Sequence, residues 1–367
     1  MQVRSLPTKE NDRLVVSTGG FFRAFFAFAI IFPNLTGTLA IIIGVFRFFY
    51  QCVVQPANLP RLLFFIAFVS YILAHGVFYF LQSGSLSNPE IKLLPILFGI
   101  ACLGLLRNIG TDYRFQTFLF GTITLFTIVG LALSVTSGGA VFRFPDYLPV
   151  KHGFISIYYG SVCVLFVALD ENKRRNLIYF LYVVLSGSGT ALLGAFVILA
   201  FRFAHVSFVR KALFIAGALL LFTVLEVTQG QRGRDLSDLD TLDRYVIQAG
   251  YVSWLQDVAS PPQILFGCGI ACEMESMPNY IKLDPFRAYL IAESDGFLSG
   301  RNLHSDHLRI FNHFGLIGWA LAVLTLYRAL QGNKHLFWAI MAMCMLNSIL
   351  TTTPFFMALL ASLRPER

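Results

Sequence analysis

The sequence predicts an all-α integral membrane protein, a bundle of about twelve transmembrane helices with one long extracytoplasmic loop between the ninth and the tenth. Two features of the composition predict this class. Hydrophobic residues make up 56% of the 367 residues and charged residues only 13%, whereas soluble domains carry about 25% charge. The mean hydropathy is +0.68, and the apolar residues gather in long runs, which is typical of membrane helices.

Twelve apolar runs are candidates for these helices. A helix needs about 20 apolar residues to cross a bilayer, or about 17 at the least, and several of the runs are shorter. Three pairs of runs lie close together and are separated by breaks at Pro33-Asn34, at 186–189 and at 351–354. The runs cover residues 18–32, 35–53, 61–82, 93–107, 115–136, 153–170, 175–187, 189–204, 211–228, 308–328, 335–350 and 353–364.

The distribution of basic residues predicts the orientation. The formal net charge is +8, but the lysines and arginines lie mostly in short loops between apolar runs, which indicates membrane topology rather than nucleic-acid binding. With the N-terminus inside, sixteen of the 28 basic residues fall on the cytoplasmic side, including the cluster Lys173-Arg174-Arg175. We therefore expect both termini in the cytoplasm and the long loop outside it.

The long loop divides the chain into three parts: an N-terminal bundle over 1–228, the loop over 229–307, and C-terminal helices over 308–367. Within the loop, apolar residues recur every three or four positions, which predicts an amphipathic helix over 239–258. That stripe comprises Leu239, Leu242, Val246, Ala249 and Val252. Pro261-Pro262 is expected to end this helix, which could lie on the membrane surface or cover the mouth of the bundle.

The six cysteines fall into two classes. Cys52, Cys102, Cys163 and Cys344 lie in apolar runs and are expected to be packing residues. Cys268 and Cys272 lie in the long loop and could form a disulfide outside the cytoplasm. Against this, a spacing of four residues within a helix directs the two thiols poorly for bridging.

Arginines near the ends of the long loop are candidates for binding an anion. Arg232, Arg234 and Arg244 follow the ninth run, and Arg301 precedes the tenth. A guanidinium keeps its charge and donates two parallel hydrogen bonds, which suits a phosphate or a pyrophosphate. The alternative is that these arginines pair with nearby aspartates on a solvated surface.

A polar cluster lies where the loop meets the tenth run. If a helix begins there, His304 and His307 share one face of it, with Asp306 beside them. A histidine can accept a proton from an attacking hydroxyl or donate one to a leaving group. The alternatives are ordinary interfacial histidines or a metal site formed by these three residues, but no glutamate or cysteine stands at a familiar ligand spacing.

The ordered combination of these segments resembles the O-antigen polymerase and O-antigen ligase superfamily. The resemblance rests on His304–Ile310 and on Phe314–Gly318. Nine residues, Asp306 to Phe314, stand between the pair His304-Ser305 and Gly315. Arg244, Trp254 and the turn 267–269 also follow in the family's order. The resemblance covers about 175–365, and the first half of the chain only by hydropathy.

The resemblance implies metal-independent glycosyl transfer on the periplasmic face of a bacterial inner membrane, without a cofactor. The donor would be a glycan on a polyprenyl pyrophosphate. An acceptor hydroxyl would displace the pyrophosphate, with inversion. Arg244 matches the family's pyrophosphate-binding arginine, and His304 matches its essential histidine, as base or as acceptor-orienting group. Arg232, Arg234, Arg301, Asp306 and His307 would complete the substrate site. A chain-length regulator is a further candidate partner.

The chain departs from the family where a Ser-Arg pair is usual, because Ser188-Gly189-Thr190 stands there. Arg232, Arg234 or Arg143 would have to replace the missing arginine, or the donor is handled differently. Gly318, where ligases of the family tend to carry threonine, favours a polymerase that joins repeat units over a ligase that transfers to lipid A core. A transporter would predict internal repeats, which the sequence lacks, and a non-enzymatic assembly protein would tolerate substitution of His304.

Overall fold

The computed structural model is almost entirely helical, as predicted. It describes residues 20–30, 33–53, 58–83, 89–106, 109–136, 154–170, 172–186, 188–203, 243–270, 272, 274, 276–281 and 303–365. The first part of the chain forms helix Gly20–Ile30, α2 (Pro33–Val53), α3 (Leu59–Ser83), 3-10 helix η1 (Pro89–Lys92), α4 (Leu93–Leu103), α5 (Tyr113–Thr136), α6 (Phe154–Leu169), α7 (Lys173–Leu185) and α8 (Gly189–Phe203).

The second part contains α10 (Asp243–Asp257), α11 (Pro261–Phe266), η3 (Met277–Tyr280), α13 (Asp306–Ala329), η5 (Gln331–Asn333), α14 (Lys334–Leu346) and α15 (Thr353–Ser362). Eleven of the twelve predicted runs therefore form helices close to their expected limits. The run 211–228 lies outside the described residues. Proline stands at the start of α2 and in the first turn of α15, where a missing backbone N–H costs nothing.

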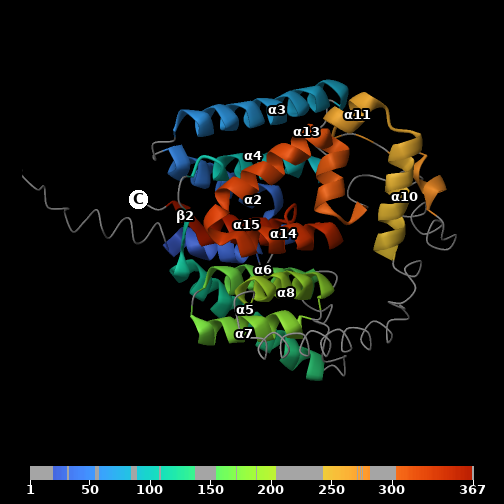
Figure 1. The fold of residues 1–367 in the computed structure, drawn as a ribbon. Helices are drawn as coiled ribbons and strands as arrows, with labels where there is room; N and C mark the ends of the chain where they lie inside the picture. Colours follow the sequence, from blue (N-terminus) through green and yellow to red (C-terminus); the bar gives the residue numbers. More distant parts are fainter. Residues whose placement is uncertain are drawn as a thin grey trace, which may run out of the picture.

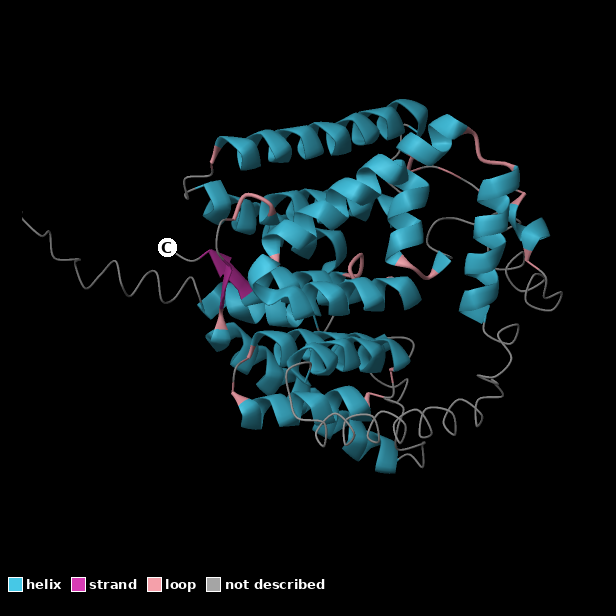
Figure 2. Ribbon diagram, viewed as in Figure 1, coloured by secondary structure: helices cyan, strands magenta, loops and turns pink. Residues whose placement is uncertain are grey.

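The helices form layers (Figures 1 and 2). In Figure 1, α3, α4 and α13 occupy the upper part, α2, α14 and α15 the middle, and α5 to α8 the lower part. Helix α14 packs against α8, α6 against α7 and α8, and α2 against α4 and α15. Two short strands, β1 (Ile109–Thr111) and β2 (Leu363–Pro365), pair antiparallel and join the start of α5 to the end of α15.

Among the residues that the structure describes, two helices are long and apolar enough to cross a membrane, namely Leu59–Leu81 of α3 and Asp306–Ala329 of α13. The outer face of α3 is apolar, with Leu59, Leu63, Leu73 and Leu81 all more than half exposed. By contrast, α4, α7, α14 and α15 have only 10 to 13 residues each. The all-α class is thus confirmed, and the number of about twelve crossings stays a prediction.

The long loop has its own small core. Helix α10 packs on η3, and the two share a buried cluster with Leu303 that includes Tyr251, Trp254 and Met277. The buried face of α10 agrees with the predicted stripe at Val246 but not at Val252, which is 45% exposed, whereas Tyr251 and Trp254 are buried. Large aromatic side chains bury more apolar surface than valine or alanine, so they determine which face turns inward. The proline pair starts α11 instead of ending α10, because proline fits the first turn of a helix.

Candidate functional site at the break in helix α13

Helix α13 is interrupted at Gly315. This residue has φ 63° and ψ −171°, a backbone conformation that is essentially restricted to glycine. Figure 1 shows the two halves of α13 meeting at an angle beside α11. A Cβ atom on Gly315 would lie only 2.3 Å from the carbonyl oxygen of Leu265, so glycine is required by both conformation and space. The predicted continuous helix over 308–328 is therefore two helices.

The loop that follows α11 satisfies the carbonyl groups freed by this break. A helix end leaves its last carbonyl groups without intrahelical partners. The backbone N–H of Cys268 donates to the oxygen of Asn312 over 2.8 Å, and the N–H of Gly269 donates to the oxygen of His313 over 3.2 Å. The hydroxyl of Tyr71 on α3 donates to the oxygen of Phe314 over 2.7 Å. Two elements distant in sequence, the loop after α11 and α3, thus hold the break in place.

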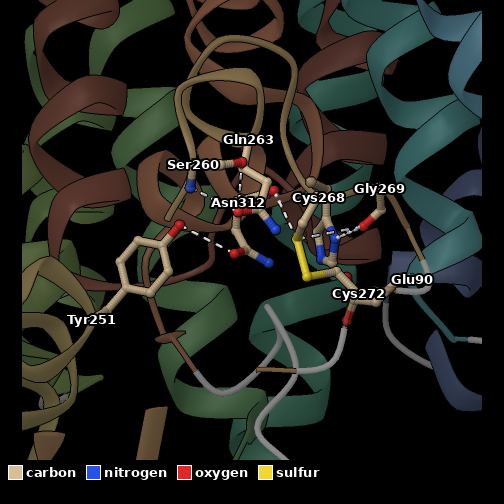
Figure 3. The surroundings of a disulfide bond; sticks show 9 residues. Glu90, Tyr251, Ser260, Gln263, Cys268, Gly269, Cys272 and Asn312 are labelled. Carbon is tan, nitrogen blue, oxygen red and sulfur yellow. Dashed lines mark hydrogen bonds and ion pairs between the residues drawn. A yellow bond between two sulfur atoms is a disulfide. The ribbon is translucent and has the colours of Figure 1, made fainter. Parts of the chain in front are cut away.

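A disulfide joins Cys268 to Cys272 within this loop (Figure 3). The objection to this bond assumed a helix, but Gly267 and Gly269 have φ values of 80° and 90°, so the chain turns here. The two Cα atoms lie 5.4 Å apart, within the usual range for a disulfide. Tyr251 reaches the same place from α10, and its hydroxyl donates to Oδ1 of Asn312 over 3.1 Å (Figure 3).

A buried ionic cluster lies on the half of α13 that precedes the break. Nε of Arg309 donates to Oε2 of Glu90 over 2.8 Å, and a second guanidinium nitrogen lies 2.6 Å from the same oxygen. Nε2 of His313 faces that oxygen across 3.4 Å, while Nδ1 of His313 donates to the carbonyl oxygen of Gly269 over 2.8 Å. The three side chains are at most 3% exposed. Because buried charges are tolerated only when they are paired, these residues depend on one another.

Glu90 lies in η1, outside the predicted spans, and keeps its charge. Burial by itself raises the pKa of the Glu90 carboxyl, but the facing side chains of His313 and Arg309 outweigh this effect and lower the pKa to about 2. The carboxylate is therefore ionised at neutral pH. It joins η1 electrostatically to the first half of α13.

Asp306 belongs to the same buried network. Its carboxylate accepts hydrogen bonds from the backbone N–H of Leu350 over 2.5 Å and from the N–H and hydroxyl of Thr351 over 3.1 and 2.5 Å. The hydroxyl of Thr351 in turn accepts from Arg309 over 2.9 Å. Asp306 is 1% exposed, and its hydrogen bonds secure the turn between α14 and α15.

His307 is also occupied by protein groups. The indole N–H of Trp319 donates to its Nδ1 over 2.9 Å. Its Nε2 lies 3.0 Å from the carbonyl oxygen of Met341. Since a carbonyl only accepts, Nε2 carries the proton, and both ring nitrogens are satisfied within the protein. Asp306 and His307 thus hold the helices together, and their contact with substrate stays a prediction.

His304 is placed differently. It precedes α13, because the helix begins at Asp306 with Ser305 as its N-cap. The prediction that His304 and His307 share a helical face was therefore wrong. His304 is exposed, and its φ of 49° makes it the sole non-glycine residue with positive φ in the described ranges. Such a conformation is uncommon for a side-chain-bearing residue and is often found at functional sites.

The predicted arginines lie in or next to segments that the structure does not describe. Arg244 lies in the first turn of α10, and its side chain is outside the described part. Arg232, Arg234, Arg301 and Arg143 also lie outside the described residues. Next to Gly189, where the resemblance would place an arginine, Ser188 is buried and its hydroxyl accepts from the N–H of Ala191 over 3.3 Å. This serine stabilises the start of α8.

Sequence reasoning missed Glu90, Arg309 and His313. Charged residues inside apolar segments signal a functional or structural cluster, and Arg309 and His313 are four residues apart on one helical face. That spacing was visible, but their partner Glu90 lies 219 positions away from Arg309. Within the described ranges, no group of three or more histidine, cysteine, aspartate or glutamate side chains could hold a metal ion.

Comparison with known protein families, with curated proteins and with solved structures found no match for this chain.

Proposed function

We propose that this protein is a membrane glycosyltransferase that polymerises glycan repeat units carried on polyprenyl pyrophosphate. The observation that carries the proposal is the placement of His304. This exposed residue directly precedes a half-helix that is fixed by buried ionic and backbone contacts and by a disulfide-bonded loop. A catalytic group needs a rigid support, and the glycine that ends this half-helix, Gly315, is the one on which the family resemblance rests.

In the proposed reaction, His304 accepts the proton of an acceptor hydroxyl. The oxygen then forms a bond to the anomeric carbon of the donor glycan, and the bond from that carbon to the pyrophosphate oxygen breaks. The electron pair leaves with the pyrophosphate, whose charge Arg244, Arg232, Arg234 and Arg301 would neutralise. Since pyrophosphate is a good leaving group, positioning and charge neutralisation supply most of the rate enhancement.

The proposed setting is a bacterial inner membrane, with about twelve crossings, both termini in the cytoplasm and the site on the periplasmic face. The apolar outer face of α3 supports a lipid environment, because soluble proteins seldom expose large apolar patches. The Cys268–Cys272 disulfide supports an oxidising compartment for the loop. This argument is independent of the charge distribution that predicted the same orientation.

The test uses purified full-length protein in liposomes with a polyprenyl-pyrophosphate-linked repeat unit and a chelator. A ladder of labelled glycan is expected for wild type and for His335→Ala, a control histidine on α14 that contacts the carbonyl oxygen of Ala168. His304→Ala is expected to yield no ladder. If wild type forms product only with lipid A core present, the protein is a ligase. Unchanged product from His304→Ala would refute the proposed role of His304.

A second candidate function is transport of a lipid-linked glycan or a small solute. It is favoured by the broken α13 and by the buried Glu90–Arg309 pair, since interrupted helices and buried ionisable residues are common in transporters. In the same liposomes, a transporter would move labelled lipid across the bilayer without forming product. Polymerisation without such movement would exclude this candidate.

A further inference from the structure

A cavity at the opposite end of the bundle from the loop core contains two arginines. It has a volume of about 50 Å³ and lies among helix Gly20–Ile30, α2, α5 and α15. A single water needs about 10–15 Å³ by this measure, so the cavity has room for a group of several heavy atoms. Its lining includes Arg23, Arg47, Gln51, Asp112, Phe26 and Phe48.

The charges in this cavity are unbalanced. The carboxylate of Asp112 lies 3.6 Å from the guanidinium of Arg23, and both side chains remain partly exposed, at 25% and 32%. The same carboxylate accepts from the backbone N–H of Phe115 over 3.1 Å and so caps the start of α5. One carboxylate therefore faces two guanidinium groups, which leaves a net positive charge.

Within the described residues, Arg47 has no close acidic partner of its own. Its guanidinium carbon lies 4.5 Å from the ring centroid of Phe22 and 5.4 Å from that of Phe26. In the described part of the chain it forms no ion pair. The two aromatic rings hold the guanidinium at the cavity and leave its N–H groups available, because cation–π contacts use the face of the guanidinium or its charge and not its donors.

We propose that Arg23 and Arg47 bind a phosphate group, and that its source is an anionic membrane lipid. A guanidinium donates two parallel hydrogen bonds to phosphate oxygens, and two guanidinium groups with Gln51 supply the donors that such a group needs. Other faces of the same two helices expose large apolar side chains, including Phe21 at 67%, Phe46 at 64% and Tyr50 at 71%. These side chains suit acyl chains, whereas a free phosphate would make no use of them.

This site differs from the one proposed for glycosyl transfer and does not depend on it. With the predicted topology, the residues around Arg23, Arg47 and Asp112 lie at the cytoplasmic end of their helices. Anionic lipids are concentrated in the cytoplasmic leaflet and attract basic residues there. The bound lipid would fasten helix Gly20–Ile30 to α2 and α5.

The experiment measures thermal unfolding of the full chain in detergent during titration with phosphatidylglycerol, phosphatidylcholine or inorganic phosphate. Phosphatidylglycerol is expected to raise the Tm of wild type, and phosphatidylcholine to leave it unchanged. Arg23→Gln and Arg47→Gln are each expected to weaken this binding about tenfold, because each removes a charge-assisted contact. Arg328→Gln is the matched control, since Arg328 also lies over a phenylalanine ring, that of Phe64 at 4.8 Å, but outside the cavity.

A variant that is expected to bind the lipid more tightly distinguishes loss of the binding site from loss of folding. Asp112→Asn removes the competing carboxylate and keeps a capping side chain, so it is expected to bind phosphatidylglycerol more tightly than wild type. Equal affinity in wild type, Arg47→Gln and Asp112→Asn would overturn the proposal. Stabilisation by inorganic phosphate but not by phosphatidylglycerol would overturn the lipid as the source of the phosphate.

Discussion

Gly267 and Gly315 pack backbone against backbone. A Cβ atom added to Gly315 would lie 2.4 Å from the backbone nitrogen of Gly267, and one added to Gly267 would lie 2.4 Å from the carbonyl oxygen of His313. The two positions belong to different parts of the chain, one to the long loop and one to the middle of α13. Their contact fixes where the loop meets the bundle.

Replacing Gly315 by alanine is expected to destabilise the protein strongly. Its backbone conformation alone costs a side-chain-bearing residue about 1–3 kcal/mol, and the contact with Leu265 adds to this. Thermal unfolding in detergent should show a clear fall in Tm. The control is Gly121→Ala in α5, where a Cβ atom meets nothing within 4 Å and alanine should stabilise the helix slightly. An unchanged Tm for Gly315→Ala would contradict the observed break.

Removing the disulfide is expected to loosen the loop that supports the break. For such a short closed loop, the chain-entropy estimate is about 2 kcal/mol. The double variant Cys268→Ser/Cys272→Ser should therefore unfold at a lower temperature than wild type. Reduction of wild type should lower its Tm to a similar value and should leave the double variant unaffected.

The same cysteines report on topology. The other four cysteines are buried, so a membrane-impermeant maleimide should label intact cells only after reduction, and only through Cys268 and Cys272. The double serine variant should remain unlabelled. Labelling that requires permeabilised cells would place this loop in the cytoplasm and invert the predicted orientation.

Glu90 and Arg309 should behave as an energetically coupled pair. Glu90→Gln leaves the guanidinium buried without its counter-ion, which typically costs about 3–5 kcal/mol. The double variant Glu90→Gln/Arg309→Met should be less destabilised than the sum of the two single variants, as measured by unfolding in a double-mutant cycle. Additive effects would show that the pair contributes no coupling.

Substitutions of His304 and of His307 should have different effects on activity and on Tm. His304→Ala is expected to abolish glycan polymerisation with little change in Tm, because the residue is exposed. His307→Ala is expected to lower the Tm, because the indole N–H of Trp319 loses its acceptor. Trp319→Phe should reproduce part of that loss. A variant of His307 with normal stability and no activity would instead support the predicted contact of this residue with substrate.

Hydrophobic runs predicted nearly every helix, because each run is a local property of the chain. The break at Gly315 was less visible, since glycine inside an apolar run is compatible with a continuous helix until another segment approaches it. The ionic cluster escaped prediction for a related reason. Arg309 and His313 are near neighbours in the sequence, but Glu90 reaches them only through the packing of α4 against α13. The left-handed backbone of His304 has no sequence signal of its own.

The small sheet has a consequence for biosynthesis. Ile109 pairs with Pro365 and Thr111 with Leu363, so β1, just before α5, meets its partner strand only after the chain from α5 to α15 has been synthesised. Pairings between such distant segments form late, because the loop between them must first be closed. The bundle therefore remains incomplete until α15 and β2 have been made, and a chain that stops before Leu363 would leave the start of α5 without its partner strand.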